Sequence, residues 1–108
     1  MSKMWKVAVI GAAGRMGSEA VAAVNQADDM ELVAALGNGD SLELLVEYSA
    51  EVMIDLTVPA VTEQNVRFAV EHDIHAVVGT TGWDQERLSN LETLLKEHPS
   101  VGVLIAPN

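Results

Sequence analysis

The sequence contains no cysteine, few aromatic residues and no long apolar run. Without thiols, a disulfide framework, a thiolate metal site and a cysteine nucleophile are all excluded. The longest apolar stretch, Val7 to Ala13, is far shorter than the ~20 residues that a membrane-spanning helix needs. The first residues, MSKMWK, lack the apolar region of a secretion signal. We therefore expect a cytoplasmic protein without a membrane segment.

Basic residues are also scarce. The chain has 6 Lys and Arg against 16 Asp and Glu, which gives a formal net charge of −10. No Lys or Arg occurs between Met16 and Val66, a stretch that contains ten acids. Such a charge repels phosphate backbones and anionic lipid, and this argues against nucleic-acid and membrane partners. The expected partner is a small molecule.

The residues that are present suit a single packed domain. Of the 108 residues, 49% are hydrophobic, which is enough for one core. Short apolar runs alternate with amphipathic stretches along the whole chain. This alternation predicts a doubly wound α/β fold with a parallel sheet, for which we expect the strand order 3-2-1-4-5. The expected strands cover residues 5–10, 31–36, 51–55, 75–79 and 101–106, and the expected helices cover residues 15–27 and 41–47, a segment from Pro59, and a segment from about Asp84 to before Pro99.

A glycine-rich loop follows the first expected strand and opens the first expected helix. It contains Gly11, Gly14 and Gly17, spaced by three residues. Such glycines permit a sharp turn, let backbone N–H groups approach a pyrophosphate, and let the helix pack close to the strand. The pattern predicts dinucleotide binding, in a crevice at the carboxyl ends of the first and fourth strands. A purely structural turn is the alternative.

Two further loops follow strands. The segment from Gly79 to Gly82, Gly-Thr-Thr-Gly, follows the fourth strand. We expect it to lie opposite the first loop and to face the nicotinamide end of a dinucleotide. A flexible turn with two capping hydroxyls is the alternative. Asp55 ends the third strand. The segment from Asp55 to Pro59 is expected to flank the adenosine or central part of the crevice, and a helix-capping carboxylate is the alternative for Asp55.

Other candidate residues favour structural roles. His72, His75 and His98 lack metal-ligand spacing, so no metal site is expected. The acids show no pair whose spacing requires general acid–base catalysis. Trp83 follows a glycine turn, where a packing anchor is favoured over a stacking platform. We therefore assign no catalytic residue to this chain.

Four motifs occur in a fixed order: VAVIGAAGRMG at 7–17, EVMIDLTVP at 51–59, HAVVGTTG at 75–82 and VLIAPN at 103–108. Together they resemble the 4-hydroxy-tetrahydrodipicolinate (dihydrodipicolinate) reductases of bacterial lysine and diaminopimelate synthesis. The resemblance implies a Rossmann-like dinucleotide-binding domain over residues 1–108 of an NAD(P)H-dependent oxidoreductase. It also implies cofactor contacts on the pyrophosphate and adenosine side from Gly11, Ala12, Ala13, Gly14, Arg15 and Met16, on the nicotinamide side from Gly79, Thr80 and Thr81, and over the nicotinamide from Ala106, Pro107 and Asn108.

In the family, a second domain carries a histidine- and lysine-bearing motif that binds and protonates the dicarboxylate substrate. That motif is absent from these 108 residues. We therefore expect the chain alone to fold and to be inactive as a reductase. The parent enzyme is expected to be a homo-oligomer, and the oligomeric state of the 108-residue chain stays open. A stand-alone dinucleotide-binding sensor without catalysis is the alternative function.

The choice between NADH and NADPH depends on three residues. Gly37 stands at the end of the second strand, where an acid commonly accepts from the ribose hydroxyls and repels a 2′-phosphate. Asp40 lies three residues on, and is either too far away or brought back by the Gly-Asn-Gly turn. Arg15 could neutralise a phosphate, with a helix-surface arginine as the alternative. We expect both NADPH and NADH to bind, with NADPH bound at least as well.

Overall fold

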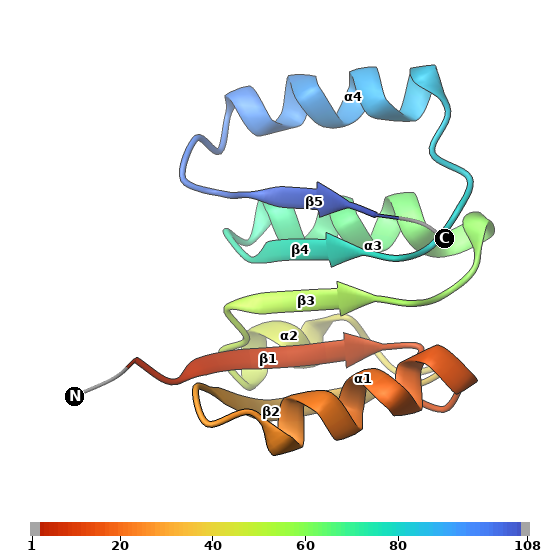
Figure 1. Cartoon of the computed structure of the whole chain (residues 1–108). Helices are drawn as coiled ribbons and strands as arrows, with labels where there is room; N and C mark the ends of the chain where they lie inside the picture. The colour runs from red at the N-terminus through yellow and green to blue at the C-terminus, as the bar shows by residue number, and fades with distance from the viewer. Residues whose placement is uncertain (1–2, 107–108) are drawn as a thin grey trace.

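The computed structural model describes residues 3–106, which form five strands and four helices in regular alternation (Figure 1). The expected elements are confirmed, with ends displaced by a few residues at most. In chain order they are β1 (Trp5–Ile10), α1 (Arg15–Gln26), β2 (Met30–Leu36), α2 (Glu43–Glu47), β3 (Val52–Asp55), α3 (Pro59–Glu71), β4 (His75–Val78), α4 (Gln85–Lys96) and β5 (Val103–Ile105).

Local sequence explains where the helices begin. Pro59 occupies the first turn of α3, where its missing N–H costs nothing and its fixed φ suits the helix. Asp84 precedes α4, and its side chain accepts a hydrogen bond from the backbone N–H of Arg87 at 2.9 Å. Gly14 precedes α1 and provides no side-chain cap. The N–H groups at the amino end of α1 are therefore left without a side-chain acceptor from this residue.

All strand pairs are parallel, which confirms the doubly wound α/β class, but the strand order differs from the expected one. The sheet runs β2-β1-β3-β4-β5 instead of 3-2-1-4-5. β3 pairs with β1 on one side and with β4 on the other. The expected neighbour of β3, β2, is an edge strand that pairs with β1.

Burial gives the physical reason for this difference. Met53 and Asp55 of β3 are completely buried, so this strand needs neighbours on both sides. The last four residues of β1 are buried, whereas β2 still has an exposed residue, Ala35, near its end and can tolerate the edge. A periodicity argument does not distinguish these two positions, because both strands are short and apolar.

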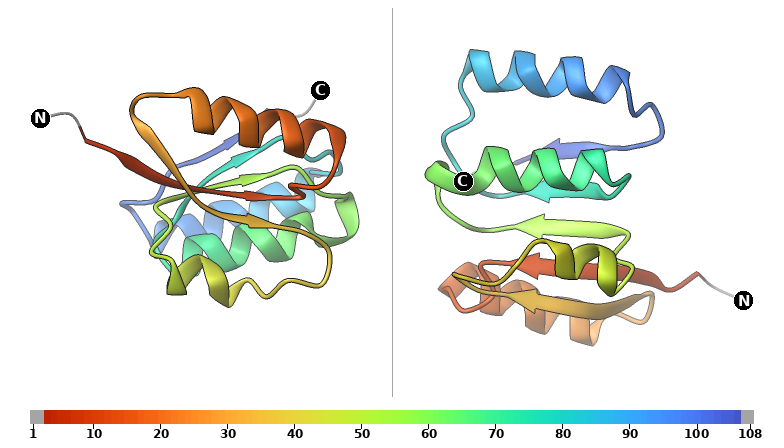
Figure 2. Two further views of the ribbon diagram at one scale, coloured as in Figure 1. Left: turned by 90° about the horizontal axis from the view of Figure 1, so that it is seen from below. Right: turned by 180° about the vertical axis from the view of Figure 1, so that it is seen from behind.

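The helices lie on both faces of the sheet, in unequal numbers. Seen along the sheet in Figure 2, α1 lies alone on one face, while α2, α3 and α4 lie on the other. Ala8 and Ile10 of β1 belong to the core beneath the larger helical layer. Val7 and Val9 alternate with them and are buried on the α1 side.

The topology also moves the expected crevice. The chain goes from β1 outward to β2, then returns past β1 to β3, so the direction reverses between β1 and β3. Ligands in such sheets bind outside the carboxyl ends of the strands at this reversal. The reversal lies beside β1 and β3, so the expectation of a crevice at the carboxyl ends of the first and fourth strands is wrong.

Candidate functional site

Two glycines of the first loop bring backbone segments into direct contact. Gly11 has φ +84°, and a methyl group at this position would lie 2.2 Å from the carbonyl oxygen of Leu56. At Gly17 a methyl group would lie 1.8 Å from the carbonyl oxygen of Gly11. Any side chain here would separate α1 from the turn after β1. The predicted roles of the first and third glycines, a sharp turn and close helix packing, are confirmed.

The amino end of α1 presents free N–H groups at this turn. The N–H groups of Gly11 and Ala12 both donate to the Leu36 carbonyl, at 2.9 and 3.1 Å, and the first helical bond runs from Ser18 N to Gly14 O. Within residues 3–106, no backbone acceptor is recorded for the N–H groups of Arg15 and Met16. The first turn carries no acidic residue. These groups and the helix dipole favour an anion at this position.

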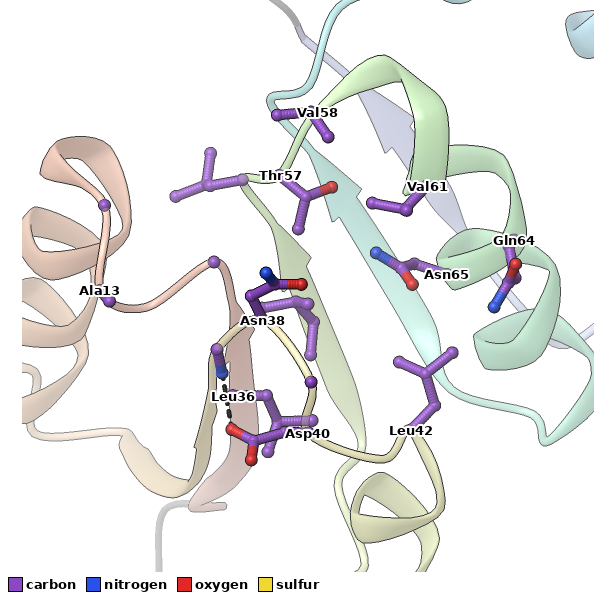
Figure 3. A pocket seen from close by; sticks show the side chains of 16 residues that line it. Ala13, Leu36, Asn38, Asp40, Leu42, Thr57, Val58, Val61, Gln64 and Asn65 are labelled. Atoms are coloured by element: carbon purple, nitrogen blue, oxygen red, sulfur yellow. Dashed lines mark hydrogen bonds between the residues drawn. The ribbon is translucent and has the colours of Figure 1, made fainter.

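A cavity of about 690 Å³ opens beside this turn, at the carboxyl ends of β1, β2 and β3 (Figure 3). One wall consists of the β2 end and the segment after it, with Leu36 and Leu42, and the other of the start of α3, with Val58 and Val61. Apolar walls of this kind suit a flat aromatic ring, and a volume of this size suits a cofactor. The remaining lining residues are Ile10, Gly11, Ala13, Gly14, Gly37, Asn38, Gly39, Asp40, Leu56, Thr57, Gln64 and Asn65.

Asp55 fixes the loop that forms one side of this cavity. Its carboxylate is fully buried and accepts hydrogen bonds from the side chains of Thr57 at 2.7 Å, Asn65 at 3.3 Å, and Thr62. The carboxylate does not line the cavity. The capping alternative for Asp55 is wrong, because α3 has no side-chain cap, whereas Leu56, Thr57 and Val58 of the same segment line the cavity as expected. Asp55 is a buried positioning residue.

The loop after β4 is joined to the same β3 loop. The hydroxyl of Thr80 donates to the Asp55 carbonyl at 3.1 Å and accepts from the Thr57 N–H at 2.8 Å. Thr80 is 4% exposed, so its side chain is buried and its hydroxyl serves to join the two loops. Gly79 leaves room for the Leu56 side chain, which a methyl group there would meet at 2.5 Å. Thr81 is exposed and remains available to a ligand.

The two hydrogen bonds of the Thr80 hydroxyl lead to a prediction for stability. We expect Thr80→Val to lower the free energy of unfolding by about 1–3 kcal/mol, because the Thr57 N–H loses its acceptor. Thr80→Ser retains the hydroxyl and should lose less. Urea denaturation of both variants provides the measurement, with the exposed Thr81→Val as the control. Equal stability of Thr80→Val and the unmodified chain would contradict the structural role of this hydroxyl.

The remaining predicted contact residues are dispersed. Arg15 has a side chain that is 95% exposed; it lies 4.0 Å from Glu19 and does not line the cavity. Ala106 donates to the Val78 carbonyl at 2.8 Å, which places it beside the end of β4. Pro107 and Asn108 lie outside the described residues.

Several other expectations have structural outcomes. Trp83 packs against the core, which confirms the packing interpretation. The N–H of Gly102 donates to the His75 ring at 2.9 Å, and His98 lies 3.1 Å from Asp73. Among residues 3–106, no group of three or more potential metal-ligating side chains occurs. None of the helices in this range combines the length and apolarity needed to cross a membrane.

The cavity also includes residues that were not predicted. Val58, Val61 and Asn65 at the start of α3 form part of its wall, with the spacing of one helix face. The apolar pattern of this segment predicts a helix but not its place beside the cavity, because that place follows from the position of β3 next to β1.

The fold and the glycine turn define the class of the protein: a Rossmann-like α/β domain with an uncapped helix amino terminus at the point where the strand order reverses direction. Residues 5–108 match the family model of the dihydrodipicolinate reductase N-terminus. The chain therefore belongs to the dihydrodipicolinate reductase family.

Individual relatives agree with this assignment. The chain is 60% identical to the 4-hydroxy-tetrahydrodipicolinate reductase of Streptomyces griseus and 59% identical to that of Streptomyces coelicolor, over its whole length in both cases. It spans 43% of the length of each. A dipicolinate-bound dihydrodipicolinate reductase from Paenisporosarcina sp. TG-14 superposes with a TM-score of 0.87 at 27% identity, covering 97% of this chain and 48% of that one.

Proposed function

We propose that the chain is the cofactor-binding part of a reductase that converts 4-hydroxy-tetrahydrodipicolinate to tetrahydrodipicolinate. The observation that carries the proposal is the uncapped amino end of α1 at the mouth of a cavity with apolar walls, in a chain of this family. The names and identities of the relatives support the reaction. Nothing favours the alternative of a non-catalytic sensor.

The residues present fit a nicotinamide dinucleotide. The N–H groups of Arg15 and Met16 would hold the pyrophosphate, and Gly14 leaves the space through which it approaches. The walls around Leu42 and Val61 would hold the adenine ring. Thr81 and Ala106, beside the end of β4, would lie toward the nicotinamide, with Gly79 and Thr80 fixing the backbone there.

The bound cofactor would supply a hydride, and this chain would hold the cofactor in the required orientation. The backbone of the first loop fixes the phosphates, while the buried Asp55 fixes the loop that joins the adenosine side to the β4 loop. Both NADH and NADPH are proposed as ligands. The substrate, a small dicarboxylate, and a homo-oligomeric state belong to the full-length enzyme in this proposal.

The proposal makes a prediction for the purified chain. We expect it to bind NADH and NADPH in calorimetry and to oxidise neither when 4-hydroxy-tetrahydrodipicolinate is added. The reason is that the described cavity carries no basic side chain that could hold two carboxylates. Turnover by the chain alone would show that catalytic groups lie within these residues. Absence of cofactor binding in a folded sample would overturn the proposed function.

A further inference from the structure

We propose that Asp40 recognises the adenosine ribose and makes the domain favour NADH over NADPH. This inference rests on the proposed function, since it concerns the selectivity of the same cavity. The usual position for a ribose-binding acid is the end of the second strand. In this chain that position is Gly37, which has no side chain to offer.

The turn after β2 returns a carboxylate to this position. Oδ2 of Asp40 accepts a hydrogen bond from the Gly37 N–H at 2.8 Å, and the Asp40 N–H donates to the Gly37 carbonyl at 3.2 Å. Gly39, with φ +92°, closes the turn between them. Figure 3 shows the carboxylate held against the end of the strand, on the wall opposite α3. Of the two alternatives for Asp40, the structure supports the one in which the Gly-Asn-Gly turn brings it back.

One oxygen of this carboxylate remains available. Within residues 3–106, Asp40 accepts no hydrogen bond other than that from Gly37, and Oδ1 is not part of it. Asp40 also lines the same cavity as Gly11 and Gly14, where the pyrophosphate is proposed to bind. A ribose between the pyrophosphate and the adenine walls would therefore meet this oxygen. A 2′-hydroxyl could donate to it directly.

The charges around the cavity oppose a 2′-phosphate. Among the described lining residues, Asp40 carries the one charged side chain. The nearest cation in sequence, Arg15, points to solvent beside Glu19, and Lys and Arg are absent from residues 16–66. A phosphate next to Asp40 would add like charges without a counter-ion. The expected preference is therefore NADH, in place of the expectation that NADPH binds at least as well as NADH.

The variant Asp40→Asn removes the negative charge and keeps the hydrogen bond that shapes the turn. An asparagine side-chain oxygen can still accept from the Gly37 N–H, so the turn should keep its shape. We expect calorimetry to show NADH bound more tightly than NADPH by the unmodified chain, and the ratio of the two dissociation constants to shift about tenfold toward NADPH in the variant. Glu43→Gln removes one nearby exposed charge outside the cavity and should leave the ratio within about twofold.

A second variant restores the acid at the usual position. A methyl group at Gly37 would meet only the Asp40 carboxylate, at 3.8 Å, so a side chain fits there. Gly37→Asp added to Asp40→Asn should return the preference to NADH. If both cofactors bind and the ratio is the same in the unmodified chain and in Asp40→Asn, this inference is wrong while the proposed function stands. If neither cofactor binds the unmodified folded chain, both fail together.

Discussion

Gly14→Val should weaken NADH binding by about 100-fold or more while the chain stays folded. A methyl group at Gly14 would meet nothing closer than the Gly11 carbonyl oxygen at 3.5 Å, which is an ordinary contact. The backbone there is extended, with φ −75° and ψ 172°, a conformation that valine adopts readily. Its branched side chain would, however, occupy the approach to the free N–H groups of α1. Calorimetry with NADH and a thermal melt provide the two measurements.

Gly17→Ala is the matched comparison, because it places a smaller side chain three residues further on. A methyl group at Gly17 would lie 1.8 Å from the Gly11 carbonyl oxygen and 2.9 Å from the Ala12 Cα, so α1 must move away from β1. We expect a clear loss of stability in addition to lost binding. If Gly14→Val binds NADH like the unmodified chain, the first loop is a structural turn and not a phosphate site. If Gly17→Ala melts normally, the close packing of α1 has been overestimated.

Asp55→Ala should lower the free energy of unfolding by about 3–5 kcal/mol. The substitution removes the acceptor of three side-chain donors, those of Thr57, Thr62 and Asn65, at a position with 0% exposure. Unpaired donors in the interior cannot turn to water. Because domains of this size are stable by about 5–15 kcal/mol in total, the variant should unfold at much lower urea concentration.

Asp84→Ala provides the control for a lost carboxylate at the surface. Asp84 is exposed and accepts one N–H at the start of α4, so its replacement should cost about 1 kcal/mol. Asp55→Asn, which keeps one carbonyl acceptor, should fall between the two. Equal denaturation midpoints for Asp55→Ala and Asp84→Ala would argue that the buried carboxylate contributes no more than an exposed cap.

The sequence predicted the elements better than their arrangement. Each strand is an apolar run bounded by turn residues, and the helices carry their start signals, as at Pro59 and Asp84. The position of β3 could not be predicted in this way, because its neighbours are decided by burial on both sides. Exposed residues at the start of a strand give no clue, because the interior strand β1 begins with two of them, as β2 does.

The same distinction applies to the candidate site, where local features were predictable and contacts between segments were not. The glycine loop was predictable because each glycine answers a local backbone requirement. Two contacts could not be predicted from periodicity. The Thr80 hydroxyl bonds to Thr57 and Asp55, which belong to a distant segment of the chain. For Asp40 the sequence left two alternatives open, and the hydrogen bond to Gly37 supports the one in which the turn brings Asp40 back.

The contact between the Gly11 turn and the Leu56 carbonyl has a consequence for how the domain can evolve. Because Gly11 meets the Leu56 backbone directly, side-chain replacements in the walls should leave the backbone at the proposed phosphate position unchanged. Mutational tolerance should therefore differ sharply within one site: Gly11 and Gly17 should admit almost no replacement, whereas Asn38, Val61 and Gln64 should accept many. Nucleotide selectivity could then change during evolution while the backbone proposed to hold the phosphates stays the same.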